Sequence, residues 1–193
     1  MRLRVPGEGV RPTTDRTKSA LFSWLGETVQ QARVLDLFAG TGSLGIEALS
    51  RGAANATFVE SSRDTLLVLK KNLTQTRLSG QADVRESTVG AFLRDGPRGF
   101  TYNLIFCDPP WIEKGADRDW VGWILEQQHL LPFLAPRGWF ILEAPSERRL
   151  ETGPFWQTED KRRYGTTTLY YLRPASSPAA TQPVAPIVTE GEA

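Results

Sequence analysis

The chain has 193 residues, with 23 Lys and Arg against 22 Asp and Glu, and a formal net charge of +1. This length suits one globular domain with a buried core. It contains neither a secretory signal nor the apolar run of about 18 residues that a membrane span needs, so we expect a cytoplasmic protein without a membrane partner. One Cys and one His exclude a disulfide framework and a Cys/His zinc site, and we expect no metal.

The first predicted element is a helix over residues 14–25. The apolar side chains of Ala20, Leu21, Trp24 and Leu25 share one face of it. Thr14 or Asp15 can cap its start, and Gly26 can end it.

Strands and helices then alternate along the chain, which predicts an α/β fold with a largely parallel, doubly wound sheet. Ligands of such sheets bind beyond the carboxyl ends of the strands. The predicted strands cover residues 34–38, 56–59, 82–85, 102–107 and 139–143, and two more over 156–172 turn at Tyr164-Gly165. The predicted helices cover 43–51, 63–76 and 117–129.

Residues 174–193 contain four Pro, five Ala and no aromatic residue. Such a segment cannot bury enough apolar surface to offset its ordering entropy, so we predict a disordered tail. The remaining residues, 1–173, form one predicted domain, which begins with a basic segment and helix over 1–26.

A glycine pattern follows the first predicted strand. Residues 34–45 read VLDLFAGTGSLG, so Gly40, Gly42 and Gly45 satisfy G-x-G-x-x-G between a strand and a helix. Glycines here permit a tight turn, close approach of a ligand to the backbone, and close helix-to-strand packing. Glu60 ends the next strand, where its carboxylate can accept hydrogen bonds from two ribose hydroxyls. The arrangement indicates a cofactor of nucleoside type.

Asp36 distinguishes between two such cofactors. Lying four residues before Gly40, it would repel the pyrophosphate of a dinucleotide, whereas it suits S-adenosylmethionine, which carries a sulfonium and an ammonium and no phosphate. The alternative is an Asp that only caps a helix or accepts a backbone hydrogen bond.

Asp108-Pro109-Pro110-Trp111 follows the strand over 102–107. The exocyclic amine of a base is a poor nucleophile, because its lone pair is delocalised into the ring. A carboxylate and the Pro109 carbonyl, both accepting from that amine, would aim the lone pair at the methyl carbon and stabilise the positive charge that develops on nitrogen. Trp111 offers a face on which an extruded base can stack. A surface turn is the alternative interpretation.

With these motifs in place, the sequence resembles the bacterial small-subunit ribosomal RNA guanine-N2 methyltransferases of the RsmD family. The resemblance implies a Rossmann-like methyltransferase fold, a mostly parallel seven-stranded sheet with a C-terminal antiparallel hairpin. It also implies methyl transfer from S-adenosylmethionine to the 2-amino group of a guanine in 16S ribosomal RNA. The matching stretches are RPTTDRTKSALFSWL (11–25), VLDLFAGTGSLGIEALSRGA (34–53), FVE (58–60), IFCDPPW (105–111) and YGTTTLYYL (164–172).

The motifs and the resemblance together define the candidate site. Trp111 stands where the family usually has Phe or Tyr, and Thr88 where it usually has Asp or Asn near the adenine amine. The expected catalytic residues are Asp108, Pro109, Pro110 and Trp111; the expected cofactor contacts are Asp36, Phe38, Ala39, Gly40, Thr41, Gly42, Glu60 and Thr88. The expected RNA contacts are Arg11, Thr13, Thr14, Arg16, Lys18, Lys161, Arg162 and Arg163.

Basic residues gather near both ends of the chain, five against two acidic ones in residues 1–18 and six against three in residues 148–173. Ordinary solvated charge is one interpretation. The other, which we follow, is that the fold brings both segments to the side of the sheet that carries Asp108. Because the net charge is small, we expect weak binding to free RNA, and a monomer that prefers 16S ribosomal RNA within assembled small-subunit particles.

Other residues are assigned more ordinary roles. We expect His129 to be non-catalytic and Cys107 to be a small core residue. Trp24, Trp139 and Trp156 are predicted core residues, while Trp120 and Trp123 are candidates for a substrate role.

Other functions remain open at this point. A DNA or other RNA methyltransferase could use Asp108-Pro109-Pro110 on the amine of adenine or cytosine. An NAD-dependent oxidoreductase would explain the glycines and Glu60 but leaves Asp36 and Asp108 without a role. A non-catalytic ribosome-assembly factor is the fourth candidate.

Overall fold

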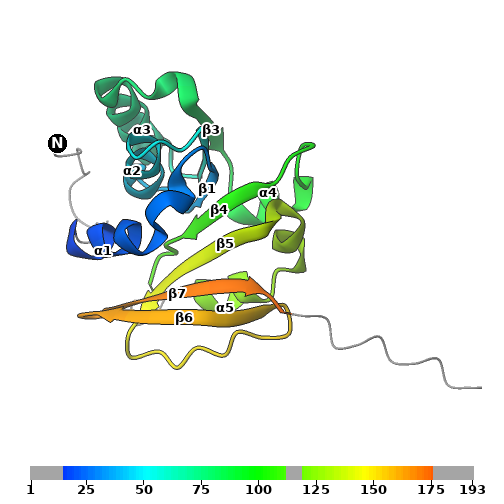
Figure 1. Ribbon diagram of the computed structural model, residues 1–193. Coiled ribbons are helices and arrows are strands. Elements are labelled where there is room, and N and C mark those ends of the chain that lie inside the picture. Colours follow the sequence, from blue (N-terminus) through cyan, green and yellow to red (C-terminus); the bar gives the residue numbers. More distant parts are fainter. Residues whose placement is uncertain (1–14, 112–118, 176–193) are drawn as a thin grey trace, which may run out of the picture.

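The computed structural model describes residues 15–111 and 119–175. Within them lies a seven-stranded sheet with helices on both faces, which confirms the predicted fold class (Figure 1). The strand order is β3-β2-β1-β4-β5-β7-β6. The strands are β1 (Arg33–Leu37), β2 (Asn55–Glu60), β3 (Ala82–Glu86), β4 (Tyr102–Cys107), β5 (Leu134–Pro145), β6 (Trp156–Tyr164) and β7 (Thr167–Pro174).

The strand directions bring several loops to one edge of the sheet. β1 to β5 run parallel, with Leu37 of β1 opposite Cys107 of β4. β7 is antiparallel to β5 and to β6, and its first residue, Thr167, lies opposite both Pro145 and Tyr164. The turn of the β6–β7 hairpin therefore lies at the same edge as the carboxyl ends of β1, β2 and β4.

The helices bury two core layers, one on each face of the sheet. α1 (Asp15–Leu25), α2 (Ser43–Ser50) and α3 (Arg63–Thr76) pack on one face, and α4 (Val89–Asp95) and α5 (Trp120–Leu125) on the other. Alternate residues of β4 show the division, because Phe106 belongs to the first layer and Cys107 to the second. Short 3-10 helices cover Gly26–Val29, Ser79–Gln81 and Gln128–Phe133.

Three elements differ from the sequence predictions. The helix predicted over 117–129 is wrong: α5 is six residues long, because the backbone becomes extended at Gln127, and a 3-10 helix with Pro132 inside follows. α4 was not predicted, because seven residues carry little periodicity. β5 begins five residues before the predicted strand, after an irregular start in which its pairing with β4 shifts register.

The ends of the chain lie partly beyond the described residues. The helix cap predicted at Thr14 or Asp15 falls on side chains outside them. Pro174 ends β7 and Ala175 donates its N–H to Phe155 O at 2.8 Å; the rest of the predicted disordered tail also lies outside. In the described part, every helix is too short or too polar to cross a bilayer.

Candidate active site

The loop after β1 is held in place by backbone and buried side-chain hydrogen bonds. Ala39 N–H donates to Val59 O at 3.0 Å, and Gly42 N–H donates to Ala39 O at 2.8 Å. Asn72, fully buried on α3, donates from Nδ2 to Thr41 O at 3.0 Å. Phe38 has a φ of +57°, a strained backbone for a non-glycine residue. The loop is thus fixed before any ligand arrives.

Two glycines of the G-x-G-x-x-G pattern meet different surroundings. A Cβ at Gly45 would lie 2.3 Å from the Phe58 ring, so Gly45 allows α2 to pack closely on β2, as expected from the sequence. At Gly40 (φ +54°) a Cβ would find only Phe38 O, at 3.9 Å. The space beside Gly40 lets a ligand approach the backbone, so the residues present fit a nucleoside cofactor.

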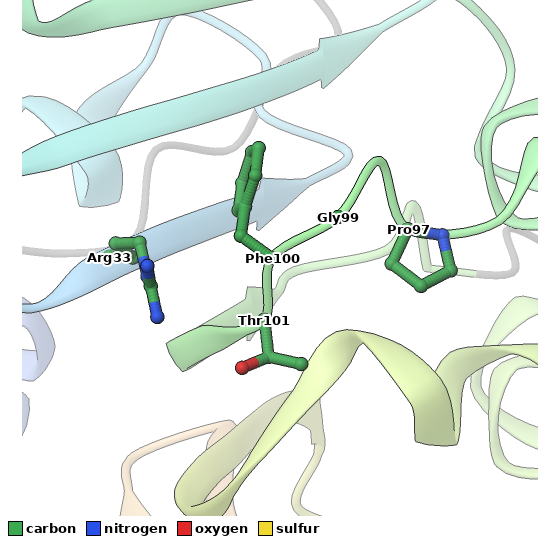
Figure 2. A pocket seen from close by; sticks show the side chains of 5 residues that line it. All are labelled: Arg33, Pro97, Gly99, Phe100 and Thr101. Carbon is green, nitrogen blue, oxygen red and sulfur yellow. The ribbon is translucent and has the colours of Figure 1, made fainter.

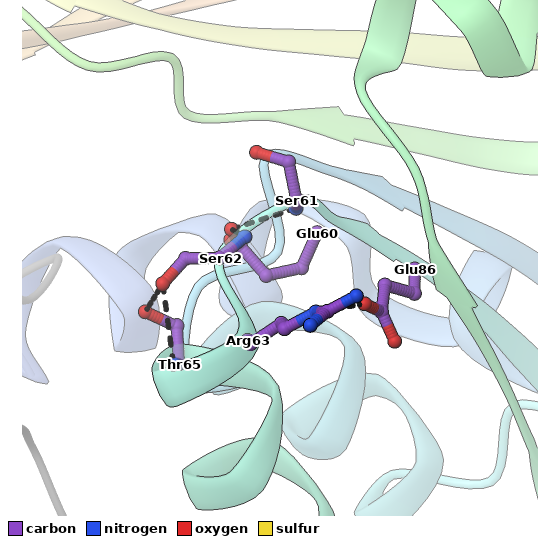
Figure 3. Close-up of polar contacts among 6 residues, drawn as sticks. All are labelled: Glu60, Ser61, Ser62, Arg63, Thr65 and Glu86. Carbon is purple, nitrogen blue, oxygen red and sulfur yellow. Dashed lines mark hydrogen bonds and ion pairs between the residues drawn. The ribbon is translucent and has the colours of Figure 1, made fainter.

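Glu60, at the end of β2, binds three backbone amides, and Figure 3 shows its contacts with two of them, those of Ser61 and Ser62. Its Oε2 accepts from Gly40 N–H at 2.9 Å, and its Oε1 accepts from the N–H groups of Ser61 and Ser62, each at 2.8 Å. Ser62 in turn caps α3, accepting from Thr65 N–H at 3.3 Å. A carboxylate has about four acceptor sites, so Glu60 keeps capacity for a ribose hydroxyl while it organises the loop. The sequence suggested only the ribose contact.

Asp36 is buried beneath the start of α2. Its Oδ2 accepts from Gly45 N–H at 2.9 Å. The pKa of Asp36 is raised to about 8, chiefly by burial and in smaller part by the nearby carboxylates of Asp108 and Glu60, against the lowering effect of the Gly45 bond. The backbone hydrogen bond considered as the alternative role of Asp36 is thus present. The same surroundings leave a group of acids that a cationic ligand would stabilise.

The Asp108–Trp111 loop begins beside the glycine loop. Leu37 and Cys107 are register partners, so Phe38 and Asp108 follow adjacent strand ends. Asp108 and Trp111 are half-buried, Pro109 is buried and Pro110 exposed. Cys107 is a buried core residue, as predicted, and burial raises the pKa of its thiol.

Thr88 lies beyond the end of β3 and caps α4. Its Oγ1 accepts from Ala91 N–H at 3.2 Å. The preceding residue, Ser87, donates its N–H to Glu60 O at 3.0 Å, which holds this segment against the end of β2. The hydroxyl of Thr88 therefore already serves the helix, in a position close to the cofactor loop.

A row of aromatic rings joins the loops at this edge. Phe38 packs edge-on against Trp120 with ring centroids 5.5 Å apart, and Trp120 packs edge-on against Trp123 at 5.5 Å. Sequence reasoning assigned Phe38 and Trp120 separately and missed their contact. Among the tryptophans predicted to be core residues, Trp156 is fully buried, whereas Trp24 and Trp139 are half-buried.

The amino-terminal basic segment is described only in part. Arg16 is exposed near the start of α1, and Lys18 Nζ lies 3.4 Å from Ser43 Oγ, at the first residue of α2. This contact places Lys18 beside the glycine loop. Arg11, Thr13 and Thr14 lie outside the described residues.

The hairpin basic residues divide between the two faces of the sheet. Arg162 is opposite Leu169, which belongs to the core layer under α1. Lys161 is opposite Tyr170, which belongs to the other layer, and Arg163 shares its face by strand alternation. All three side chains are exposed near the hairpin turn. The segments thus reach the edge that carries Asp108, but they do not form one uniform patch.

A shallow hollow lies at the opposite edge of the sheet (Figure 2). Arg33 begins β1 and Thr101 precedes β4, so the hollow is at the amino ends of these strands. It is separate from the candidate site. In residues 15–111 and 119–175, no three His, Cys, Asp or Glu side chains are grouped as a metal site would require.

Comparison with known proteins agrees with this geometry. The model of the family described as Conserved hypothetical protein 95 matches residues 2–173. The chain belongs to this family. It is 40% identical to Ribosomal RNA small subunit methyltransferase D of Escherichia coli K12 over 154 residues, 79% of this chain and 74% of that protein.

Further relatives give the same result. Ribosomal RNA small subunit methyltransferase D of Haemophilus influenzae is 36% identical over 70% of this chain and 77% of its own length. The solved structure of a putative methyltransferase, yhhF, from Escherichia coli aligns with a TM-score of 0.69 and 33% identity, covering 87% of this chain and 89% of that one. The resemblance to the RsmD family is confirmed.

Proposed function

We propose that this chain transfers a methyl group from S-adenosylmethionine to the 2-amino group of a guanine in 16S ribosomal RNA. The observation that carries the proposal is the joining of two loops at one sheet edge. Leu37 and Cys107 are paired, so the glycine loop and Asp108-Pro109-Pro110-Trp111 begin side by side. The names of the relatives support ribosomal RNA of the small subunit as the substrate.

The cofactor contacts follow from the ends of β1 and β2. Gly40 offers backbone with open space beside it, and Glu60 is already oriented by three amides. Asp36 adds a buried carboxyl group that holds a proton in the free protein and whose ionised form a nearby positive charge would stabilise. When bound, S-adenosylmethionine supplies a methyl carbon on a positively charged sulfur.

The residues after β4 prepare the accepting amine. The Asp108 carboxylate and the Pro109 carbonyl accept hydrogen bonds from the two N–H groups, which leaves the nitrogen lone pair directed away from them. As the nitrogen–carbon bond forms and the carbon–sulfur bond breaks, Asp108 stabilises the positive charge on nitrogen. The surplus proton then leaves the nitrogen, and Asp108 is the base that this loop offers. Trp111 stacks on the base.

The basic segments support a folded particle as substrate. Lys18 of α1 contacts Ser43 at the start of α2, and the hairpin with Arg162 lies at the same edge. Phosphate contacts dominate RNA affinity, and these segments carry few positive charges. An assembled particle therefore supplies shape-complementary contacts that free RNA lacks. We propose that the enzyme acts as a monomer in the cytoplasm, where such particles assemble.

The test compares 16S ribosomal RNA from a strain without this gene with RNA from strains complemented by the wild type or by Asp108→Ala. Nucleoside mass spectrometry should show one N2-methylguanosine lost in the deletion, restored by the wild type and not by the variant. Loss of a methylated adenine or cytosine would assign a different amine. Unchanged 16S modification would contradict the proposal.

A further inference from the structure

A hydrogen bond joins the first helix to the last hairpin. Trp24 of α1 donates from Nε1 to Asp160 Oδ2 of β6 at 2.9 Å, across 136 residues of sequence. The same indole stacks on Tyr171 of β7, with ring centroids 3.8 Å apart and planes inclined by 29°. It also meets Trp139 of β5 edge-on at 4.9 Å. α1 is therefore attached to β5, β7 and β6, which are three successive strands of the sheet.

Asp160 is the polar centre of this attachment. Besides Trp24, it accepts from Arg162 Nε at 2.9 Å and from its neighbour's backbone, Lys161 N–H, at 2.8 Å. It follows the point where the β6–β7 register shifts, between Thr158 and Asp160. Partial desolvation raises the pKa of the Asp160 carboxyl, but the bonds from Arg162, Trp24 and Lys161 together outweigh it and lower the pKa, so the group is ionised at neutral pH.

The other end of α1 reaches the glycine loop, residues 38–42. Lys18 Nζ contacts Ser43 Oγ at 3.4 Å, at the start of α2. Trp24 lies six residues later, about 9 Å further along the helix. α1 thus spans the distance between the glycine loop and the hairpin, and it has basic residues at its start.

We propose that Asp160 is a positioning residue that holds α1 and the β6–β7 hairpin in one fixed RNA-binding surface and orients Arg162 within it. This role rests on the proposed function, because it presupposes that α1 and the hairpin bind RNA. Asp160 itself touches neither cofactor nor the accepting amine.

The sign of the effect separates positioning from simple electrostatics. Removing a negative charge beside Arg162 should strengthen RNA binding if charge alone matters, because each phosphate contact becomes more favourable. If Asp160 positions the surface, its removal weakens binding although the protein becomes more positive. Asp160→Asn keeps an acceptor for the Trp24 indole and should recover most of the loss.

The chain provides a matched control in β3, the outermost strand on the side of the sheet away from β6. Asp83 Oδ2 accepts from Arg85 Nε at 2.8 Å, the same spacing of two residues as in the Asp160–Arg162 pair. Asp83→Ala therefore removes the same charge and the same kind of ion pair, without a contact to α1.

The experiment measures KM for small-subunit particles, kcat, cofactor affinity and Tm for the full chain and its variants. Asp160→Ala and Trp24→Phe should each raise KM about 2- to 10-fold, the range expected for one net hydrogen bond. The KM of the double variant should not exceed that of the single variant with the higher KM, because both substitutions remove the same interaction. The kcat, the cofactor affinity and the behaviour of Asp83→Ala should stay within about twofold of wild type.

Three results would overturn the proposal: tighter RNA binding by Asp160→Ala, an unchanged KM, or additive effects in the double variant. A fall in kcat and cofactor affinity that follows the loss in Tm would show a general structural role instead. If the wild type transfers no methyl group to the particles, the proposed function fails first. If the wild type is active and the variants match it, only the positioning role fails.

Discussion

Glu60 Oε2 accepts the backbone N–H of Gly40 at 2.9 Å, so the acid that ends β2 holds the glycine loop that follows β1. A residue that would bind the cofactor ribose is thus also part of the loop's own structure. Its substitution should affect cofactor binding in two ways, by removing an acceptor and by releasing the loop.

Glu60→Ala should weaken the binding of S-adenosylmethionine by about 1.5–3 kcal/mol, the cost of losing hydrogen bonds to a charged group. Calorimetric titration measures this directly. Glu86→Ala is the control, because Glu86 is the register partner of Glu60 on β3 and bonds the exposed Arg63 instead of the loop. Tight binding of NAD without binding of S-adenosylmethionine would contradict the cofactor assignment.

Asp108→Ala should lower kcat by about two orders of magnitude or more, with cofactor affinity nearly unchanged, because its proposed contact is to the accepting amine. Single-turnover methyl transfer and calorimetry on one preparation separate the two quantities. Asp95→Ala, an exposed acid at the end of α4, should leave both unchanged. Equal loss of affinity and turnover would place Asp108 at the cofactor.

Asp36 should give the free protein a characteristic pH dependence. Its pKa is raised from 3.8 to about 8 by burial, so the folded state holds a proton that the unfolded state releases. The resulting stability is fully present below about pH 4 and is lost as the pH rises toward 8. Denaturant unfolding of wild type and Asp36→Asn, compared at pH 5 and pH 8, measures the difference. Wild type should lose more stability than the variant between these pH values; parallel curves would show that Asp36 titrates normally.

The split of the hairpin charges predicts unequal effects of charge reversal. Arg162 shares its face with α1 and Arg163 lies on the other, so Arg162→Glu should reduce methylation of particles more than Arg163→Glu. The double variant should also reduce the slope of activity against salt concentration. Faster methylation of naked 16S RNA than of particles, or no response to either reversal, would refute this account of recognition.

Much of the fold could be predicted because local patterns and tertiary structure agree. The helix over 63–76 and the strand over 102–107 match the structure residue for residue. Ser62, a strong N-cap residue, marks the start of that helix, and the apolar run Leu104-Ile105-Phe106-Cys107 marks the strand. Asp117–His129 failed because a periodic pattern cannot show where the backbone becomes extended.

The candidate site was predictable in its motifs but not in its contacts. The spacing of glycines and acids places Glu60 and Asp36 near one loop, yet the three amides on Glu60 depend on how β1 and β2 pair. The Trp24–Asp160 bond joins residues too distant in sequence for any local pattern to predict. The positive φ of Phe38 could not be predicted either, because a left-handed backbone favours glycine and the tertiary structure imposes it here on a Phe.

The most direct test of the central claim is methyl transfer in vitro to small-subunit particles from cells that lack this gene. Labelled S-adenosylmethionine and purified enzyme are mixed with the particles, and the 16S RNA is digested to nucleosides for mass spectrometry. The account predicts label in N2-methylguanosine alone with the wild type and at least about 100-fold less with Asp108→Ala. Label in another nucleoside, or equal label with both proteins, would contradict it.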